Sequence, residues 1–218
     1  MIRGIDLSAN QGEISDAQWQ SLATSGIRFA YLRCGVGNDV PDTRFAAYVA
    51  GAKAVGIVVG AYHFAYPLPD STEHPGRDPE SQCQAHFEAC SGLGSNTGEL
   101  PMALDAEWPV PQDWGHWGCA ADQITEWLLR YLAKAKSLYG RDPIVYTYPD
   151  WAGHVGLVGL DAYRLWIASY ESTPTIPAPW TSWSVWQSSG GTSFKLPNGA
   201  PCDEDQIADE ATLASLLA

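Results

Sequence analysis

The sequence predicts an α/β fold, a single irregular (β/α) barrel, from three features of its pattern. Short apolar segments alternate with longer segments in which apolar residues recur at helical spacing. Most of the short segments are apolar almost throughout, as expected for parallel strands that are covered on both faces. Connections from helix to strand are short, whereas several connections from strand to helix are long. Long loops at the carboxyl ends of the strands are typical of TIM-like barrels, which place their active sites at that end.

Seven apolar segments are the candidate strands of this barrel. They are Arg3–Leu7, Ile27–Arg33, Ile57–Phe64, Pro101–Glu107, Ile144–Tyr148, Leu165–Ser169 and Ser184–Gln187. An eighth, very short strand at Asp203 would close the barrel. The long connections that follow strands run from Ala65 to Pro79, Trp108 to Ala120, Pro149 to Asp161, Tyr170 to Trp183 and Ser188 to Cys202. Because the chain shows no internal repeat or linker, we expect a single domain over residues 1–218.

Apolar stripes and helix-ending residues predict four helices around these strands. Their limits are Asp16 to Gly26, Phe45 to Gly56, Ile124 to Gly140, and Asp209 to the C-terminus. Asp16 and Asp209 are candidate N-caps, since a short side-chain oxygen accepts a hydrogen bond from the first turn. The first three helices end at glycine, which readily adopts the left-handed conformation common after a helix.

Charge and aromatic content narrow the classes of partner. The formal net charge is -13, and this acidity argues against nucleic acid and anionic membranes, which both attract basic patches. No apolar stretch reaches the roughly 18 residues of a transmembrane helix. The chain has 10 Trp and 10 Tyr against 5 Phe. Aromatic rings with a polar tip suit a sugar-binding groove, although we expect most of them in the barrel core.

The cysteines and histidines predict neither a metal centre nor a disulfide framework. The five cysteines have an odd count and spacings that match no zinc or redox motif: Cys34, Cys83, Cys90, Cys119 and Cys202. Cys83 and Cys90 would share a helix face but lie about 10 Å apart, too far for a disulfide. The histidines are scattered, and we expect His63 to be a hydrogen-bonded residue near the core. We therefore expect mostly free thiols, no cofactor and no metal.

Asp105 and Glu107 are the most informative residues of the sequence. They follow the apolar run 100–104, which is typical of a buried strand. Side chains two residues apart on a strand project from the same face, so the two carboxylates are expected side by side. We expect both the charge of Asp105 and the apolar surroundings next to Trp108 to raise the pKa of Glu107. A protonated acid beside an anionic one is the pair used in glycoside hydrolysis. The alternative is a pair that faces water where the strand ends.

Two further acids are expected at the same end of the barrel. Asp6 ends the first strand, and Asp203 lies where the eighth strand would close the barrel. Four carboxylates in one bowl without a compensating base must either bind a cation or hold shifted pKa values. A cation is the main competing explanation, and hard oxygen ligands suit Mg²⁺ or Ca²⁺.

Ordered motifs along nearly the whole chain resemble those of the Chalaropsis-type lysozymes, glycoside hydrolase family 25. The motifs are Gly4-Ile5-Asp6-Leu7-Ser8 with Asn10-Gln11, Phe29-Ala30-Tyr31-Leu32-Arg33, Gly60-Ala61-Tyr62-His63-Phe64, Leu104-Asp105-Ala106-Glu107, Tyr146-Thr147-Tyr148, Leu165-Trp166-Ile167-Ala168, Trp186-Gln187 and the late Asp203. Each motif alone is weak, but their order and spacing make the resemblance specific.

The resemblance implies a muramidase that cleaves the β-1,4 bond between N-acetylmuramic acid and N-acetylglucosamine in peptidoglycan. It implies that Glu107 is the general acid, that Asp105 is its anionic partner, and that Asp6 and Asp203 line the same site. We expect substrate contacts from seven further residues, most of them aromatic and near strand ends: Arg33, Tyr62, Tyr66, Trp108, Tyr148, Trp186 and Gln187. Trp186 has a structural alternative, as part of the barrel wall.

Two departures from the family pattern bear on these roles. Arg33 stands where the family commonly has Lys, and since Arg does not donate its proton, a structural or substrate-positioning role is expected. The closing motif often reads Asp-x-Asn in the family, but here it is Asp203-Glu204-Asp205. A non-catalytic glycan-binding barrel and a cation-assisted hydrolase using the same carboxylates remain the alternatives.

The setting of the enzyme is an expectation from what the sequence lacks. The chain begins Met1-Ile2-Arg3 and enters a strand without a signal peptide. We expect synthesis in the cytoplasm and action on the cell wall after release or export by another route. We also expect a monomer without an appended wall-binding module. Binding to glycan strands must then come from its own groove or from a partner.

Overall fold

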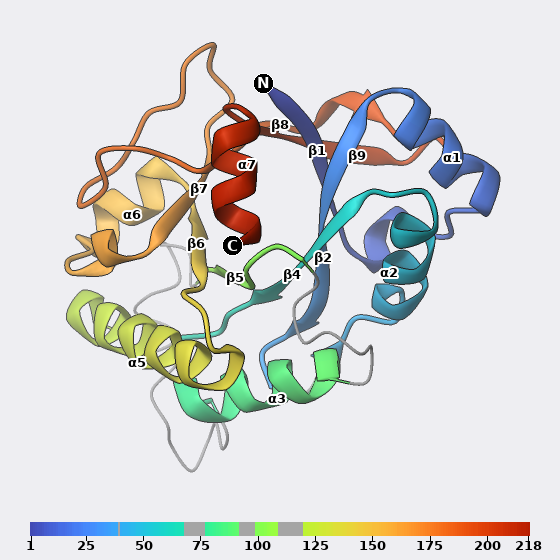
Figure 1. Cartoon of the computed structure of the whole chain (residues 1–218). Helices are drawn as coiled ribbons and strands as arrows, with labels where there is room; N and C mark the ends of the chain where they lie inside the picture. The colour runs from blue at the N-terminus through green and yellow to red at the C-terminus, as the bar shows by residue number, and fades with distance from the viewer. Residues whose placement is uncertain (39, 68–76, 92–98, 109–119) are drawn as a thin grey trace.

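The fold is a closed barrel of eight strands with helices packed around it (Figure 1). The computed structural model describes residues 1–38, 40–67, 77–91, 99–108 and 120–218. The barrel strands are β1 (Ile2–Leu7), β2 (Ile27–Val36), β4 (Val58–Phe64), β5 (Ala103–Asp105), β6 (Ile144–Thr147), β7 (Arg164–Ala168), β8 (Val185–Lys195) and β9 (Pro201–Ile207). The pairing of β1 with β2 closes the sheet, and β3 (Val40–Pro41) extends β2 at the rim. The predicted barrel is confirmed.

The last strand differs from the prediction in both length and direction. β9 has seven residues, and it pairs antiparallel with β8 and with β1. The segment 188–195, predicted as part of a long loop, instead continues β8. Only residues 196–200 join the two strands, which is too short for a parallel crossover of a dozen or more residues. An antiparallel hairpin is therefore the only closure that this connection permits.

Six α-helices are described, and two of them lie outside the four predicted. They are α1 (Asp16–Thr24), α2 (Phe45–Ala54), α3 (Pro79–Ser91), α5 (Ala121–Tyr139), α6 (Pro149–Val155) and α7 (Glu210–Leu217), with 3-10 turns at Ala9–Gln11 and Leu160–Ala162. α6 occupies a segment predicted as loop, and Pro149 starts it because a first-turn residue needs no N–H. Ser15, rather than the predicted Asp16, caps α1, whereas Asp209 caps α7 as predicted. No described helix is both long and apolar enough to span a membrane.

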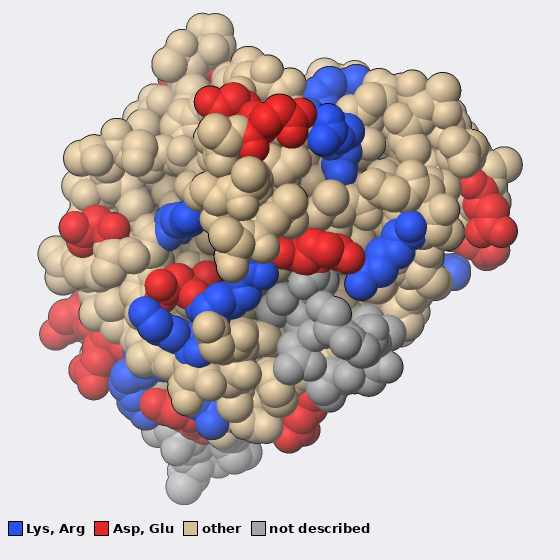
Figure 2. Space-filling model, in the orientation of Figure 1, with Lys and Arg blue, Asp and Glu red and all other residues tan. Residues whose placement is uncertain are grey.

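Helix α7 covers the end of the barrel opposite the long loops and lies in front of the strands in Figure 1. Leu213 and Leu216 pack into the barrel interior with residues such as Ile2 and Ile207 from the strands. Arg141 and Arg164 donate hydrogen bonds to the last carbonyl groups of α7, where a helix attracts positive charge. Around α7, Lys and Arg side chains lie interspersed with Asp and Glu (Figure 2). This end of the barrel is thus closed, and the open end is left for a site.

The upper interior of the barrel is built from aromatic side chains. Tyr31 stacks on Trp166 with ring centroids 4.5 Å apart, and Tyr62 and Tyr146 meet the indole edge-on at 6.0 and 4.8 Å. All four rings are buried. They form a floor under the carboxyl ends of the strands, so any polar group above them is shielded from water on one side. The expectation that most Trp residues belong to the core holds for Trp19, Trp151, Trp166 and Trp180, among others.

Candidate active site

A pocket of about 270 Å³ opens above this floor at the carboxyl ends of the strands. All eight barrel strands contribute to its lining, together with the loops that follow some of them: Asp6, Ser8, Asn10, Gln11, Arg33, Tyr62, Phe64, Asp105, Glu107, Tyr146, Trp166, Gln187 and Asp203. The four acids singled out in the sequence therefore share one bowl, as predicted. Asp6 lies directly across the β1–β9 pair from Asp203.

Asp105 and Glu107 face the bowl because the chain alternates through this segment. Leu104 and Ala106 point outward into the core between barrel and helices, whereas Ala103 lies in the barrel interior. The strand itself is shorter than predicted and ends at Asp105. Glu107 nevertheless keeps the extended alternation and lines the pocket with Asp105. The same-face geometry inferred from the i, i+2 spacing is present in the structure.

Burial raises the pKa of every acid in the bowl. The pKa of Glu107 rises to about 7, first through burial and then through the charge of Asp203. That of Asp6 also rises to about 7, through burial and again Asp203. The pKa of Asp105 lies well above its usual value because of burial and the neighbouring Glu107. Of the two expected causes of the raised pKa of Glu107, burial is confirmed, whereas the neighbouring charge is that of Asp203 and not that of Asp105.

Gln187 holds the acid on β1 in place. Its Nε2 donates to Asp6 Oδ2 at 2.7 Å, while Tyr146 and Tyr170 each donate a hydroxyl proton to its Oε1 at 3.0 Å. Two donors on the amide oxygen fix which way the amide points, so its nitrogen must face Asp6 and Asp203. Gln187, predicted to bind substrate, is thus placed to orient two carboxyl groups.

The motif Asp203-Glu204-Asp205 divides between the two faces of β9. Glu204 points outward and pairs with Arg3 at 2.9 Å. Asp205 points inward, is 1% exposed, and accepts a hydrogen bond from Trp166 Nε1 at 2.8 Å. Burial and the charge of Asp6 raise the pKa of Asp205 well above its usual value. A protonated Asp205 can donate to Asp6, as the amide of an Asn at this position would.

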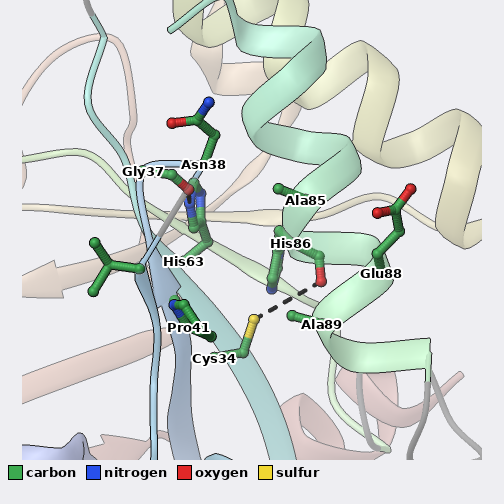
Figure 3. Close-up of a pocket in the computed structure, with 11 residues that line it drawn as sticks. Cys34, Gly37, Asn38, Pro41, His63, Ala85, His86, Glu88 and Ala89 are labelled. Carbon is green, nitrogen blue, oxygen red and sulfur yellow. Dashed lines mark hydrogen bonds between the residues drawn. The ribbon is translucent and has the colours of Figure 1, made fainter. Parts of the chain in front are cut away.

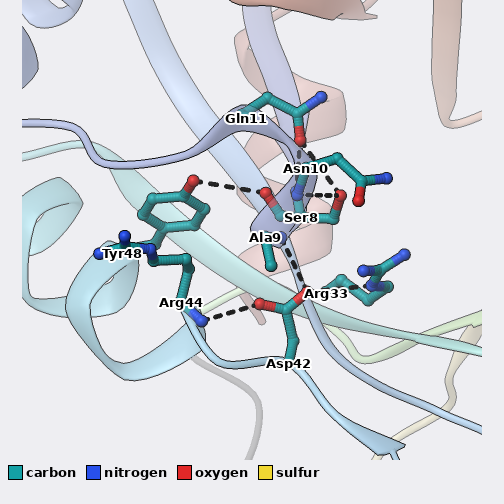
Figure 4. A network of polar contacts seen from close by, with 8 residues as sticks. All are labelled: Ser8, Ala9, Asn10, Gln11, Arg33, Asp42, Arg44 and Tyr48. Atoms are coloured by element: carbon teal, nitrogen blue, oxygen red, sulfur yellow. Dashed lines mark hydrogen bonds and ion pairs between the residues drawn. The ribbon is translucent and has the colours of Figure 1, made fainter.

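Arg33 lies at the rim of the bowl and forms an ion pair with Asp42, which lies outside the bowl lining (Figure 4). Its Nε donates to Asp42 Oδ2 at 3.0 Å, and the same carboxylate accepts the backbone N–H groups of Ala9 and Arg44 at 2.9 Å each. Asp42 thereby ties the turn after β1 to the end of β2. The charge of Arg33 lowers the pKa of Asp105 without overcoming its burial. Of the two roles expected for Arg33, the structural one agrees with this geometry.

The aromatic residues predicted to contact substrate separate into three groups: two that line cavities, two that pack together outside them, and one in the barrel wall. Tyr62 lines the bowl, and Tyr148 lines an adjoining cleft of about 690 Å³ that shares Glu107 and Tyr146 with it. Tyr66 and Trp108 pack edge-on with ring centroids 4.6 Å apart, outside the lining of both cavities.

Trp186 lies in the outer core and donates its indole N–H to the Ser169 carbonyl at 2.6 Å. It belongs to the barrel wall, because Gln187, its neighbour on β8, takes the inward position. Sequence reasoning also missed residues that the structure places in the cavities, among them Phe64, Tyr146 and Tyr170. Tyr146 could have been found, since it begins one of the quoted motifs at the end of a strand.

Comparison with known proteins gives one consistent family. Residues 5–195 match the sequence model of Glycosyl hydrolases family 25. The chain is 30% identical to Lysozyme M1 of Streptomyces globisporus over 225 residues, which cover 100% of this chain and 70% of that protein. It is 28% identical to the N,O-diacetylmuramidase of Chalaropsis sp over 203 residues, covering 88% and 90%. The bacterial lysozyme structure from Streptomyces coelicolor superposes with a TM-score of 0.80 at 28% identity, covering 100% of this chain and 95% of that one.

We predict that Asp205→Asn makes the fold less sensitive to pH. The pKa of Asp205 is raised in the folded chain, so the folded state keeps a proton that the unfolded chain loses above about pH 4. This contribution to the free energy of unfolding is complete below the unfolded pKa and declines as pH rises. The variant should therefore gain stability relative to the wild type progressively as the pH rises above about 4, as measured by urea unfolding. Glu204→Gln, on the outer face of β9, is the matched control. A wild-type-to-variant difference that is constant with pH would contradict the buried, protonated state.

Proposed function

Because the chain belongs to glycosyl hydrolases family 25, we propose that it cleaves the β-1,4 bond between N-acetylmuramic acid and N-acetylglucosamine in bacterial peptidoglycan. The chain is a glycoside hydrolase of the lysozyme type. The observation that carries the proposed reaction is the position of Glu107. This carboxyl lines both the bowl and the adjoining cleft, and its pKa is raised to about 7.

Glu107 is the proposed general acid. A carboxyl group with a pKa near the working pH still carries its proton there and can transfer it to the departing glycosidic oxygen. Burial and the charge of Asp203 supply that raised pKa. The cleft that extends from Glu107 past Tyr148 and Tyr170 offers room for the sugar units on one side of the scissile bond.

Asp105 is the proposed partner that stabilises positive charge on the sugar. In the free protein burial favours its neutral form. A positive charge that develops beside it in an oxocarbenium-like transition state favours the ionised form, since an opposite charge lowers the pKa of an acid. Arg33 acts in the same direction. The carboxylate is therefore stabilised more strongly in the transition state than in the ground state, as catalysis requires.

The geometry favours protonated acids over a bound cation in the bowl. Among the described residues, the only group of three candidate ligand atoms within 4.8 Å of one another lies elsewhere, at Cys34, His86 and Cys90. The bowl's carboxyl groups instead have raised pKa values. Clearing of a cell-wall suspension in the presence of EDTA separates the two mechanisms, because a cation-assisted hydrolase would stop.

Glu107→Gln should lower kcat at least 10²-fold, the low end for loss of a general acid. Glutamine keeps the volume and polarity of the side chain but has no proton to transfer. The measurement is release of reducing ends from soluble peptidoglycan strands, with circular dichroism to confirm the fold. Binding of the same strands should be retained. Near-normal turnover by a folded variant would remove Glu107 from the mechanism, and wall binding by a wild type without turnover would favour a glycan-binding barrel.

Asp203→Asn should move the alkaline limb of the pH–rate profile to lower pH. Asp203 is the charge that raises the pKa of Glu107 after burial, so a neutral Asn lets Glu107 lose its proton earlier. The profile of kcat/KM between about pH 3 and pH 9 reports this ionisation in the free enzyme. Because the acids titrate together, the apparent values belong to the cluster rather than to one residue. Glu204→Gln should leave both limbs in place, and an unmoved alkaline limb in Asp203→Asn would show that this charge does not reach Glu107.

Tyr148→Ala should weaken oligosaccharide binding by about 10-fold, which corresponds to about 1.4 kcal/mol. The Tyr148 ring lines the cleft beside Glu107, where it can pack against the C–H face of a sugar. Tyr148→Phe keeps the ring and removes the hydroxyl, so it should retain most of the affinity. Isothermal titration with a soluble glycan fragment measures both variants. Equal losses in Ala and Phe would assign the contribution to the hydroxyl instead of the ring.

A further inference from the structure

A second cluster of chemically active side chains lies behind the barrel wall, between β2 and α3 (Figure 3). Arg33 on β2 lines the bowl, and the next residue, Cys34, points to the opposite face of the strand, toward α3. His86 and Cys90 are four residues apart on α3 and so share its face. All three side chains are buried, with exposed fractions of 1%, 2% and 0%.

The three side chains are close enough to share one ion. The ligand atoms of Cys34, His86 and Cys90 all lie within 4.8 Å of one another. Around a tetrahedral zinc, with Zn–S about 2.3 Å and Zn–N about 2.0 Å, such atoms are about 3.5 to 3.8 Å apart. Small side-chain rotations therefore suffice to bring them onto one centre. Two sulfurs and one imidazole nitrogen are donors that zinc prefers.

A chain of hydrogen bonds fixes the tautomer of His86. His63 Nε2 lies 2.6 Å from the Gly37 carbonyl, which can only accept, so this nitrogen carries the proton. The Tyr131 hydroxyl lies 3.0 Å from the other ring nitrogen, Nδ1, which accepts its proton because the proton of this buried imidazole is on Nε2.

The Tyr131 oxygen, having donated its proton, accepts from His86 Nδ1 at 3.1 Å, and the Tyr139 hydroxyl oxygen lies farther from the same nitrogen, at 3.4 Å. His86 Nε2 then carries a lone pair. This atom is buried and has no hydrogen-bond partner among the described residues. An imidazole whose other nitrogen is held by an outer partner is the usual arrangement of a metal-binding histidine.

We propose that Cys34, His86 and Cys90 bind one Zn²⁺ ion, which links α3 to the barrel wall. A pocket of about 240 Å³ borders Cys34 and His86 and has room for a water molecule as the fourth ligand. The metal ligand is the thiolate, so each cysteine gives up any proton it carries when the metal binds.

The test is metal binding by the reduced, chelator-treated protein. All five thiols are first counted after denaturation, and Co²⁺ is then titrated as a spectroscopic probe. We expect one equivalent, with thiolate-to-cobalt charge transfer, the intense visible bands of tetrahedral cobalt, and displacement of both by Zn²⁺. One equivalent of Zn²⁺ should also raise the melting temperature.

Matched variants locate the ion. Cys34→Ser and Cys90→Ser should each weaken Zn²⁺ binding at least 10²-fold. Cys83→Ser is the control, because Cys83 is equally buried on α3 but packs into a different part of the core. Should a cluster variant fail to fold, zinc-edge X-ray absorption of the wild type gives the same answer, with two sulfur ligands and at least one nitrogen expected.

Two results would overturn the proposal. One is a folded wild type that, once fully reduced, binds neither Co²⁺ nor Zn²⁺ at one equivalent. This result overturns the proposal also when the untreated protein lacks two free thiols because Cys34 and Cys90 form a disulfide. The other is one-equivalent binding that persists in both serine variants, or an absorption spectrum without sulfur ligands.

Discussion

The structure depends on burying several carboxyl groups where almost no positive charge can balance them. Asp6, Asp105 and Asp205 are at least 92% buried, and Glu107 and Asp203 complete the group at the rim. Among the described residues that line the bowl, Arg33 is the one Lys or Arg, and it already pairs with Asp42. Since charges buried without partners are costly, the pKa values of these acids are raised. The property that makes the site difficult to fold at neutral pH is also the one that provides a proton donor for hydrolysis.

Trp166 connects this electrostatic constraint to the packing of the barrel. Its indole packs in the interior against Tyr31, Tyr62 and Tyr146. Its N–H donates a hydrogen bond to Asp205. The aromatic floor excludes water from below, while the few polar atoms it offers, such as the Tyr146 hydroxyl, reach Gln187 and so indirectly Asp6. The raised pKa values thus result from the choice of side chains that fill the barrel, as well as from the acids themselves.

The sequence was sufficient where one local rule decides the outcome. Alternation along a strand placed Asp105 and Glu107 on one face, and the long loops identified the end of the barrel that carries the site. The sequence was insufficient where the pairing with a neighbouring strand decides which way a side chain points. Asp205 and Trp186 each follow a simple alternation, but which face is inward depends on the register of β9 and β8 with their neighbours. The identity of the charge beside Glu107 likewise required the closure of β9 against β1, because Asp203 is 96 residues away along the chain.

One strand shows how the barrel keeps two different environments apart. On β2, Arg33 contributes to a polar bowl open to solvent, and Cys34, one residue later, contributes to a buried cluster of thiols and an imidazole. Successive side chains on a strand point to opposite faces, so the backbone of the barrel wall lies between them. A substitution that alters charge in the bowl therefore makes no direct contact with the cluster. A change at the cluster affects the bowl only if it moves β2 or α3.

The cysteine spacing gave no sign of this arrangement, because a strand supplies Cys34 and a helix some fifty residues later supplies His86 and Cys90. The fold, rather than any contiguous motif, brings these donors together.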